Sequence, residues 1–205
     1  MNVSSLLKMS DTSVMVKALL FGAGFAILSI EILGVRILAP SVGASMPVWG
    51  AVIGVTLLGG AIGYYAGGAL ADAGRSRRAL IILSVLSGLA IILLPTFNGV
   101  IAPYIQALPF AVGALVASGA LFLFPTTMLS ALITYTIRLH VRDLDTIGRV
   151  HGDLYAIATF GSIAGVFATS YLLIPFYAVS HILYGLGMMV FLLGIFLYAR
   201  KVDLL

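Results

Sequence analysis

The chain has 205 residues, of which 61% are hydrophobic and 9% charged, and its formal net charge is +4. A soluble domain carries about a quarter charged residues, so the composition excludes a soluble fold and predicts a protein of the lipid bilayer. One-sided basic loops explain the positive charge, which therefore does not indicate nucleic-acid binding. Without cysteine the chain has no disulfide framework, no thiolate metal site and no cysteine nucleophile.

Six apolar segments are long enough to cross a membrane as helices, which takes roughly 20 residues each. The first is too long for the core of a cleavable signal peptide, so we expect it to be retained. The predicted spans are 17–39, 48–71, 79–95, 108–137, 151–173 and 178–199. The fourth contains Pro125, which is expected to kink it. Residues 1–16 form the expected N-terminal arm and residues 200–205 the expected tail.

Basic residues mark alternate connections between these spans. Ten of the eleven lysines and arginines lie in the N-terminal arm and first span start, the second-to-third connection, the fourth-to-fifth connection and the tail. The connections 40–47, 96–107 and 174–180 carry no charge, and 96–107 is interpreted as a surface loop. By the positive-inside rule both termini are cytoplasmic, which predicts a multi-pass protein of the cell membrane.

The spans divide into two groups of three with opposite orientation, which is the layout of an inverted repeat. The middle span of each group carries small residues four apart, a spacing that lets helix backbones approach closely in lipid. These predicted packing residues are Gly59, Gly63, Gly67, Gly161 and Gly165. Packing within the bundle is favoured over a dimer face, although the motif serves both uses.

Glu31 and Arg36 are the acid and the base that lie well inside an apolar segment. Five residues separate them, so they diverge by about 140° around one helix and are poorly placed to pair. A charge near mid-membrane costs about 3 kcal/mol, so each is expected to face a cavity or another helix. We treat both as candidate substrate-binding residues. A structural polar network remains the alternative, as does extension of Arg36 toward the membrane surface.

Asp72 ends the second span, where the helix dipole disfavours an acid. It is expected to cap a neighbouring helix end or to pair with one of three arginines that follow, Arg75, Arg77 and Arg78. The pattern Gly68-x-x-x-Asp72-x-Gly74-Arg75 resembles the loop after the second span of major facilitator transporters, with one residue fewer before the glycine. That resemblance implies a conformational latch. The alternative is a positive-inside loop with a capped helix end.

Residues 138–153 form the most polar stretch. Its histidines and aspartates are His140, Asp143, Asp145, His151 and Asp153. They show no established metal-ligand spacing, so we interpret the stretch as a solvated loop. The chain also has no Ser-His-Asp order, phosphate-cradling loop or dinucleotide fingerprint. We therefore predict no metal, no cofactor, no catalytic residue and no enzyme activity of the chain by itself.

Several short motifs in order give the chain a wider resemblance over about 28–176. In the first half they are Glu31, Arg36, Leu38-Ala39-Pro40, Gly43, Trp49, Gly59 and Gly68-x-Leu70-Ala71-Asp72. In the second half they are Phe124-Pro125-Thr126, Gly148-Arg149, Leu154-Tyr155-Ala156, Gly161-Ser162, Gly165 and Leu173-Ile174-Pro175. With these motifs the chain resembles the membrane domain of spermidine synthase-like membrane proteins, often described as fused major facilitator/spermidine synthases. Ala158 precedes Thr159 where that family commonly has an asparagine.

The resemblance implies an all-α polytopic bundle of six spans, similar to half of a major facilitator transporter. Fused members continue into a cytoplasmic aminopropyltransferase domain, whereas this chain stops at Leu205, so a soluble spermidine synthase-like partner is implied instead. We predict an integral membrane module that binds or moves a small, cationic or amphiphilic metabolite such as a polyamine. Two alternatives stay open: a homodimeric secondary transporter, and a membrane anchor or assembly subunit that transports nothing.

Overall fold

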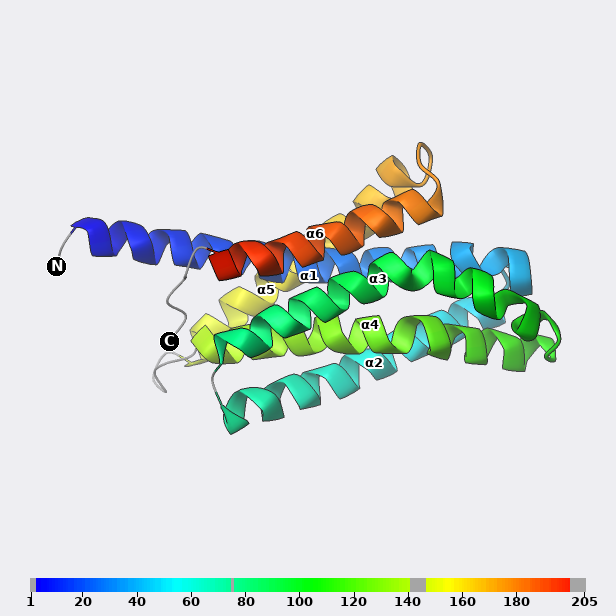
Figure 1. Ribbon diagram of the computed structural model, residues 1–205, viewed down its shortest axis with the longest axis horizontal. Helices are drawn as coiled ribbons and strands as arrows, with labels where there is room; N and C mark the ends of the chain where they lie inside the picture. Colours follow the sequence, from blue (N-terminus) through cyan, green and yellow to red (C-terminus); the bar gives the residue numbers. More distant parts are fainter. Residues whose placement is uncertain (1–2, 75, 141–146, 200–205) are drawn as a thin grey trace.

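The computed structural model describes residues 3–74, 76–140 and 147–199, without the side chains of 3–13, 77, 198 and 199. These residues form α1 (Val3–Val42), α2 (Met46–Ala73), α3 (Arg77–Gln106), α4 (Phe110–His140), α5 (Ile147–Phe167), the π-helix η1 (Ala168–Leu173) and α6 (Val179–Ala199) (Figure 1). The described residues contain six helices long and apolar enough to cross a membrane. The predicted helical class is confirmed, and each of these six helices overlaps one of the predicted spans.

Two expected boundaries differ from the structure. The third helix does not end at residue 95 but continues to Gln106, so the expected loop 96–107 is helical almost throughout. The sequence misleads here because Pro95 and Pro103 lie inside α3, and prolines are tolerated in membrane helices when their surroundings satisfy the freed carbonyl groups. The expected N-terminal arm is helical from Val3. Arg75, Arg142 and the tail 200–205 lie outside the described residues.

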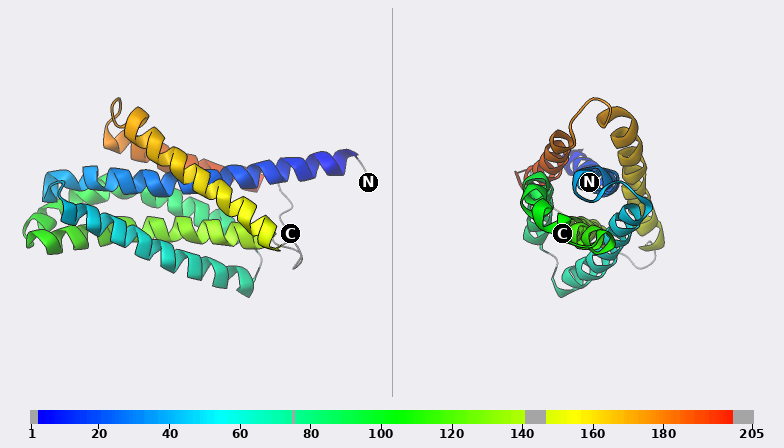
Figure 2. Two further views of the ribbon diagram at one scale, coloured as in Figure 1. Left: turned by 180° about the vertical axis from the view of Figure 1, so that it is seen from behind. Right: turned by 90° about the vertical axis from the view of Figure 1, so that its right-hand side faces the viewer.

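The helices are packed in three principal pairs. α2 lies along α4, α1 along α5 and α3 along α6, and α4 also contacts α3 and α1. The first turns of α3 and α5 and the last turns of α2, α4 and α6 lie at the end of the bundle from which the N-terminal part of α1 extends (Figures 1 and 2). We call this the basic end, because Arg78, Arg138 and Arg149 lie in those turns.

The helix pairs show the symmetry of a repeat. If α1, α2 and α3 are relabelled as α4, α5 and α6, and the reverse, the list of principal pairs stays the same. The α2–α4 pair then becomes the α5–α1 pair, and the α3–α6 pair becomes itself. At the centre of that self-related pair, a Cβ atom on Gly88 would lie 2.7 Å from the carbonyl oxygen of Gly187, and one on Gly187 would lie 2.6 Å from that of Gly88. This reciprocity is what an inverted repeat of three-helix units produces.

The five glycines predicted to mediate packing all lie at contacts between helices of this chain. Gly59, Gly63 and Gly67 lie against α4, and Gly161 and Gly165 lie against α1. A Cβ atom on Gly63 would overlap the carbonyl oxygen of Thr127, and one on Gly161 would overlap that of Phe21. The backbones therefore approach so closely that any side chain would separate the helices.

We expect Gly63→Ala to destabilise the bundle, because overpacking a close contact costs about 1–3 kcal/mol. Gly54→Ala is the matched control on the same helix, since a Cβ atom there meets nothing within 4 Å. Thermal melts in detergent should show a melting temperature lower by several degrees for the first variant only. Equal melting temperatures for both would contradict the assigned contact.

Candidate functional site

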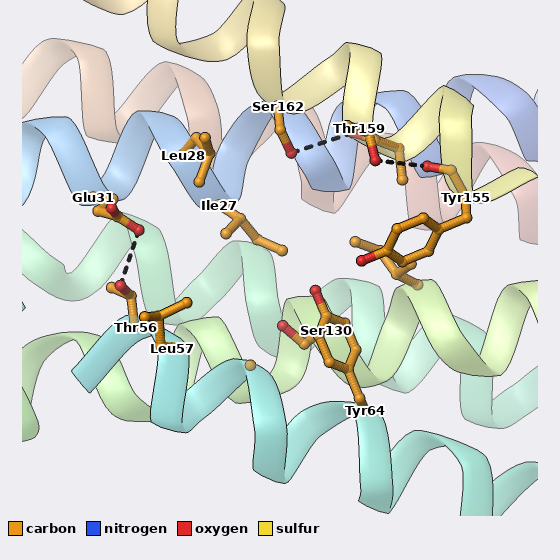
Figure 3. Close-up of a pocket in the computed structure, with 13 residues that line it drawn as sticks. Ile27, Leu28, Glu31, Thr56, Leu57, Tyr64, Ser130, Tyr155, Thr159 and Ser162 are labelled. Atoms are coloured by element: carbon orange, nitrogen blue, oxygen red, sulfur yellow. Dashed lines mark hydrogen bonds between the residues drawn. The ribbon is translucent and has the colours of Figure 1, made fainter. Parts of the chain in front are cut away.

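A polar pocket of about 160 Å³ lies among α1, α2, α4 and α5 (Figure 3). Glu31 of α1 and Thr56 of α2 lie at one end. Tyr64 of α2, Ser130 of α4 and Tyr155 of α5 lie at the other. The sequence predicts that Glu31 faces a cavity, and the structure places it in this pocket.

Thr56 holds the carboxyl group of Glu31 in position. Its Oγ1 lies 2.9 Å from Oε2 of Glu31 and 2.9 Å from the carbonyl oxygen of Ile53. A threonine hydroxyl has one proton to donate. It donates that proton to an ionised Glu31, or accepts one from a protonated Glu31 and donates to Ile53. The same geometry therefore serves both charge states of the acid.

The hydroxyl groups of Tyr64, Ser130 and Tyr155 point toward one another at the other end of the pocket (Figure 3). On α5, Thr159 donates to the carbonyl oxygen of Tyr155 over 3.0 Å. Ser162 lies 3.1 Å from the carbonyl oxygen of Gly24. Since these two hydroxyls serve backbone carbonyls, the hydroxyls left to meet a ligand are those of Tyr64, Ser130 and Tyr155, and Tyr64 interacts with the other two.

The sequence analysis did not select these hydroxyl-bearing residues. A usable signal exists on α5, where Tyr155, Thr159 and Ser162 are spaced i, i+4 and i+7 and therefore share one helix face. Tyr64 and Ser130 give no such signal. Each is one of several hydroxyl-bearing residues on its helix, and only the packing of α2 on α4 and of α5 nearby shows that they meet.

Arg36 is not brought into the pocket. Its side chain is exposed, and it is not among the residues that line the cavity around Glu31. This follows from the five-residue spacing, which directs the two side chains to different sides of α1. The two candidate substrate-binding residues are thus separated, and only Glu31 belongs to the candidate site.

Asp72 has a partner that the sequence analysis did not consider. Its Oδ1 lies 2.9 Å from Nε of Arg138, in the last turn of α4. Of the expected partners, Arg75 and the side chain of Arg77 lie outside the described residues, and Arg78 is exposed. α2 and α4 run parallel in contact, so the last turn of one lies beside the last turn of the other. The pair is therefore a cross-link between two helix ends.

Tyr135 of α4 adds a second contact at the basic end. Its side chain is fully buried. Its hydroxyl oxygen accepts the backbone N–H of Ser76 over 2.7 Å and lies 2.7 Å from the carbonyl oxygen of Ser76 and 3.2 Å from that of Gly74. Gly68, one helical turn before Asp72 on α2, lies beside Thr134 of α4. Gly74 and Ser76, on either side of Arg75, are thus both held on α4.

Comparisons with protein-family models, curated proteins and solved structures find no significant match to this chain. The resemblance to spermidine synthase-like membrane proteins therefore stays a prediction. Within the described residues no three His, Cys, Asp or Glu side chains gather as metal ligands would. Asp143 and Asp145 lie outside those residues.

We expect Tyr135→Phe to destabilise the protein more than Asp72→Asn does. The first change removes several hydrogen bonds between a fully buried side chain and the backbone of Gly74 and Ser76, each worth about 0.5–1.5 kcal/mol. The second removes an exposed ion pair, with Asp72 63% and Arg138 44% exposed, and such pairs contribute less than about 1 kcal/mol. Tyr104→Phe, at a residue 74% exposed, is the control. If melts rank Asp72→Asn as the more damaging variant, the buried tyrosine is not the main contact of the latch.

Proposed function

We propose that this chain is an integral membrane module that binds or moves a small organic cation. The proposal is supported by six apolar helices and by a polar pocket that lies among four of them. An acid within a membrane span costs free energy, and a bound cation is one way to offset that cost.

The observation that carries the proposal is the charge of the pocket lining. Among the described residues that line it, Glu31 is the one acid and no residue is basic. An ionised Glu31 therefore lacks a full counter-charge from the protein, and a bound cation supplies it. The rings of Tyr64 and Tyr155 also border the pocket, and aromatic faces attract organic cations.

A homodimeric secondary transporter is the second candidate, favoured by how open the pocket is. Leu57, Tyr64 and Tyr155 line it and are 67%, 41% and 48% exposed. Polar groups open to acyl chains are unfavourable, and a second copy packed over α2 and α5 would cover them. The oligomeric state of the protein in lipid nanodiscs distinguishes this arrangement from a monomer.

A soluble spermidine synthase-like partner remains part of the proposal on the resemblance alone. If this part of the proposal holds, a co-expressed spermidine synthase-like protein should purify with the chain in defined stoichiometry. The interpretation as an anchor or assembly subunit predicts a fully packed bundle, and the polar pocket argues against it.

The decisive variant is Glu31→Gln, which keeps the size of the side chain and its hydrogen bonding but removes the charge. We expect it to fold and to lose at least tenfold in affinity for a small organic amine, measured by calorimetry in nanodiscs. Arg36→Gln is the control, since Arg36 lies outside the pocket. If Glu31→Gln binds amines as the wild type does, Glu31 has a structural role only.

We further propose that the basic end faces the cytoplasm, on the one-sided distribution of lysine and arginine. The chain has no cysteine, so single cysteines can be labelled without a background. Met46→Cys, at a residue 81% exposed at the opposite end, should react with an impermeant reagent on intact cells. Ser76→Cys should react only after the membrane is opened. The reverse pattern would invert the proposed orientation.

A further inference from the structure

The pocket is elongated, and its two ends differ in chemistry. Thr56 and Tyr64 are eight residues apart on α2, so their Cα atoms are separated by about 12 Å along the helix. The Glu31 end carries a carboxyl group, whereas the Tyr64 end carries hydroxyl groups only. Between them the wall is apolar, formed by residues such as Ile27, Leu57 and Ile133.

We propose that the ligand is a short, unbranched monoamine with one neutral hydrogen-bonding group at its far end, an amino alcohol in the simplest case. Its ammonium group binds Glu31, its alkyl chain lies along the apolar wall, and its hydroxyl group binds Tyr64, Ser130 and Tyr155. This inference rests on the proposed function and makes it specific, because it selects among organic cations by the group at the far end.

The dimensions of the pocket bound the length of the ligand. If the polar groups at the two ends are about as far apart as these Cα atoms, a hydrogen bond of about 3 Å at each end leaves about 6 Å between the ligand's polar groups. Long side chains lean toward the N-terminus of their helix, so the hydroxyl of Tyr64 shortens this span. The volume of about 160 Å³ is close to that of an engineered cavity of about 150 Å³ that holds benzene, with its six non-hydrogen atoms. Four-carbon amino alcohols satisfy both limits.

The lining selects against a diamine. A second ammonium group at the Tyr64 end would be partly desolvated, and no carboxylate among the described lining residues faces it. A neutral hydroxyl group at that end loses little on leaving water and regains its hydrogen bonds from three hydroxyls. A plain alkylamine makes the contact with Glu31 but offers nothing to those three groups.

Three four-carbon probes test this selection: butan-1-amine, 4-aminobutan-1-ol and butane-1,4-diamine. Calorimetry on the full chain in nanodiscs should give 4-aminobutan-1-ol a Kd at least about 5-fold lower than either of the others, the effect of one net hydrogen bond. Tyr64→Phe should abolish that preference, because it removes one of the hydroxyl groups that the amino alcohol binds. Tyr65→Phe is the matched control, because its side chain is 82% exposed and lies outside the pocket.

The outcomes separate this inference from the function on which it rests. If no amine binds the wild type, both fail. If amines bind and Glu31→Gln abolishes binding, but the diamine binds as tightly as the amino alcohol, the proposed function stands and this inference is overturned. It is also overturned if Tyr64→Phe keeps the preference. Should Tyr64→Phe fail to fold, Ser130→Ala provides the same comparison at the same end of the pocket.

Discussion

The close approach of backbones at α2–α4 and α1–α5 is the contact on which the rest of this structure depends. Gly59, Gly63 and Gly67 form the row of α2 that touches α4, so the neighbouring row with Thr56, Gly60 and Tyr64 faces the pocket. On α5 the row with Gly161 and Gly165 touches α1, and Tyr155 and Thr159 face the same cavity. The glycine row has no side chains, so the helices touch along it, and this contact turns the neighbouring row of residues toward the pocket.

The sequence predicts those features that depend on composition or on a costly residue. Apolar length identifies the six helices, and the cost of a charge in lipid identifies Glu31 as facing a cavity. The helical stretch 96–106 is missed because prolines and polar residues favour a loop in water but are tolerated in lipid. Arg138 is missed as the partner of Asp72 because 66 residues separate them, and a local search for counter-charges does not reach that far.

Tyr135 and Tyr64 illustrate why the remainder of the site could not be predicted. Both are tyrosines in apolar spans, where the usual expectation is a position at the membrane interface. In the structure one is fully buried and hydrogen-bonded to Gly74 and Ser76, and the other is 41% exposed at the pocket. Which role each takes depends on the rotation of α4 and α2 about their axes, and that rotation is set by glycine contacts between helices far apart in sequence.

The pocket lies between two closely packed helix pairs, α2–α4 and α1–α5. The contacts of the five predicted packing glycines are within the pairs, whereas the hydrogen bond from Thr56 to Glu31 joins α2 of one pair to α1 of the other. In the proposed function, a cation at Glu31 binds beside Thr56, because a carboxylate accepts several hydrogen bonds, and so adds a contact at the link between the pairs. Ligand binding then acts on the contacts that hold the two pairs together, while the glycine contacts keep each pair rigid. An acid at the contact within one pair could not both bind a ligand and link that pair to the other.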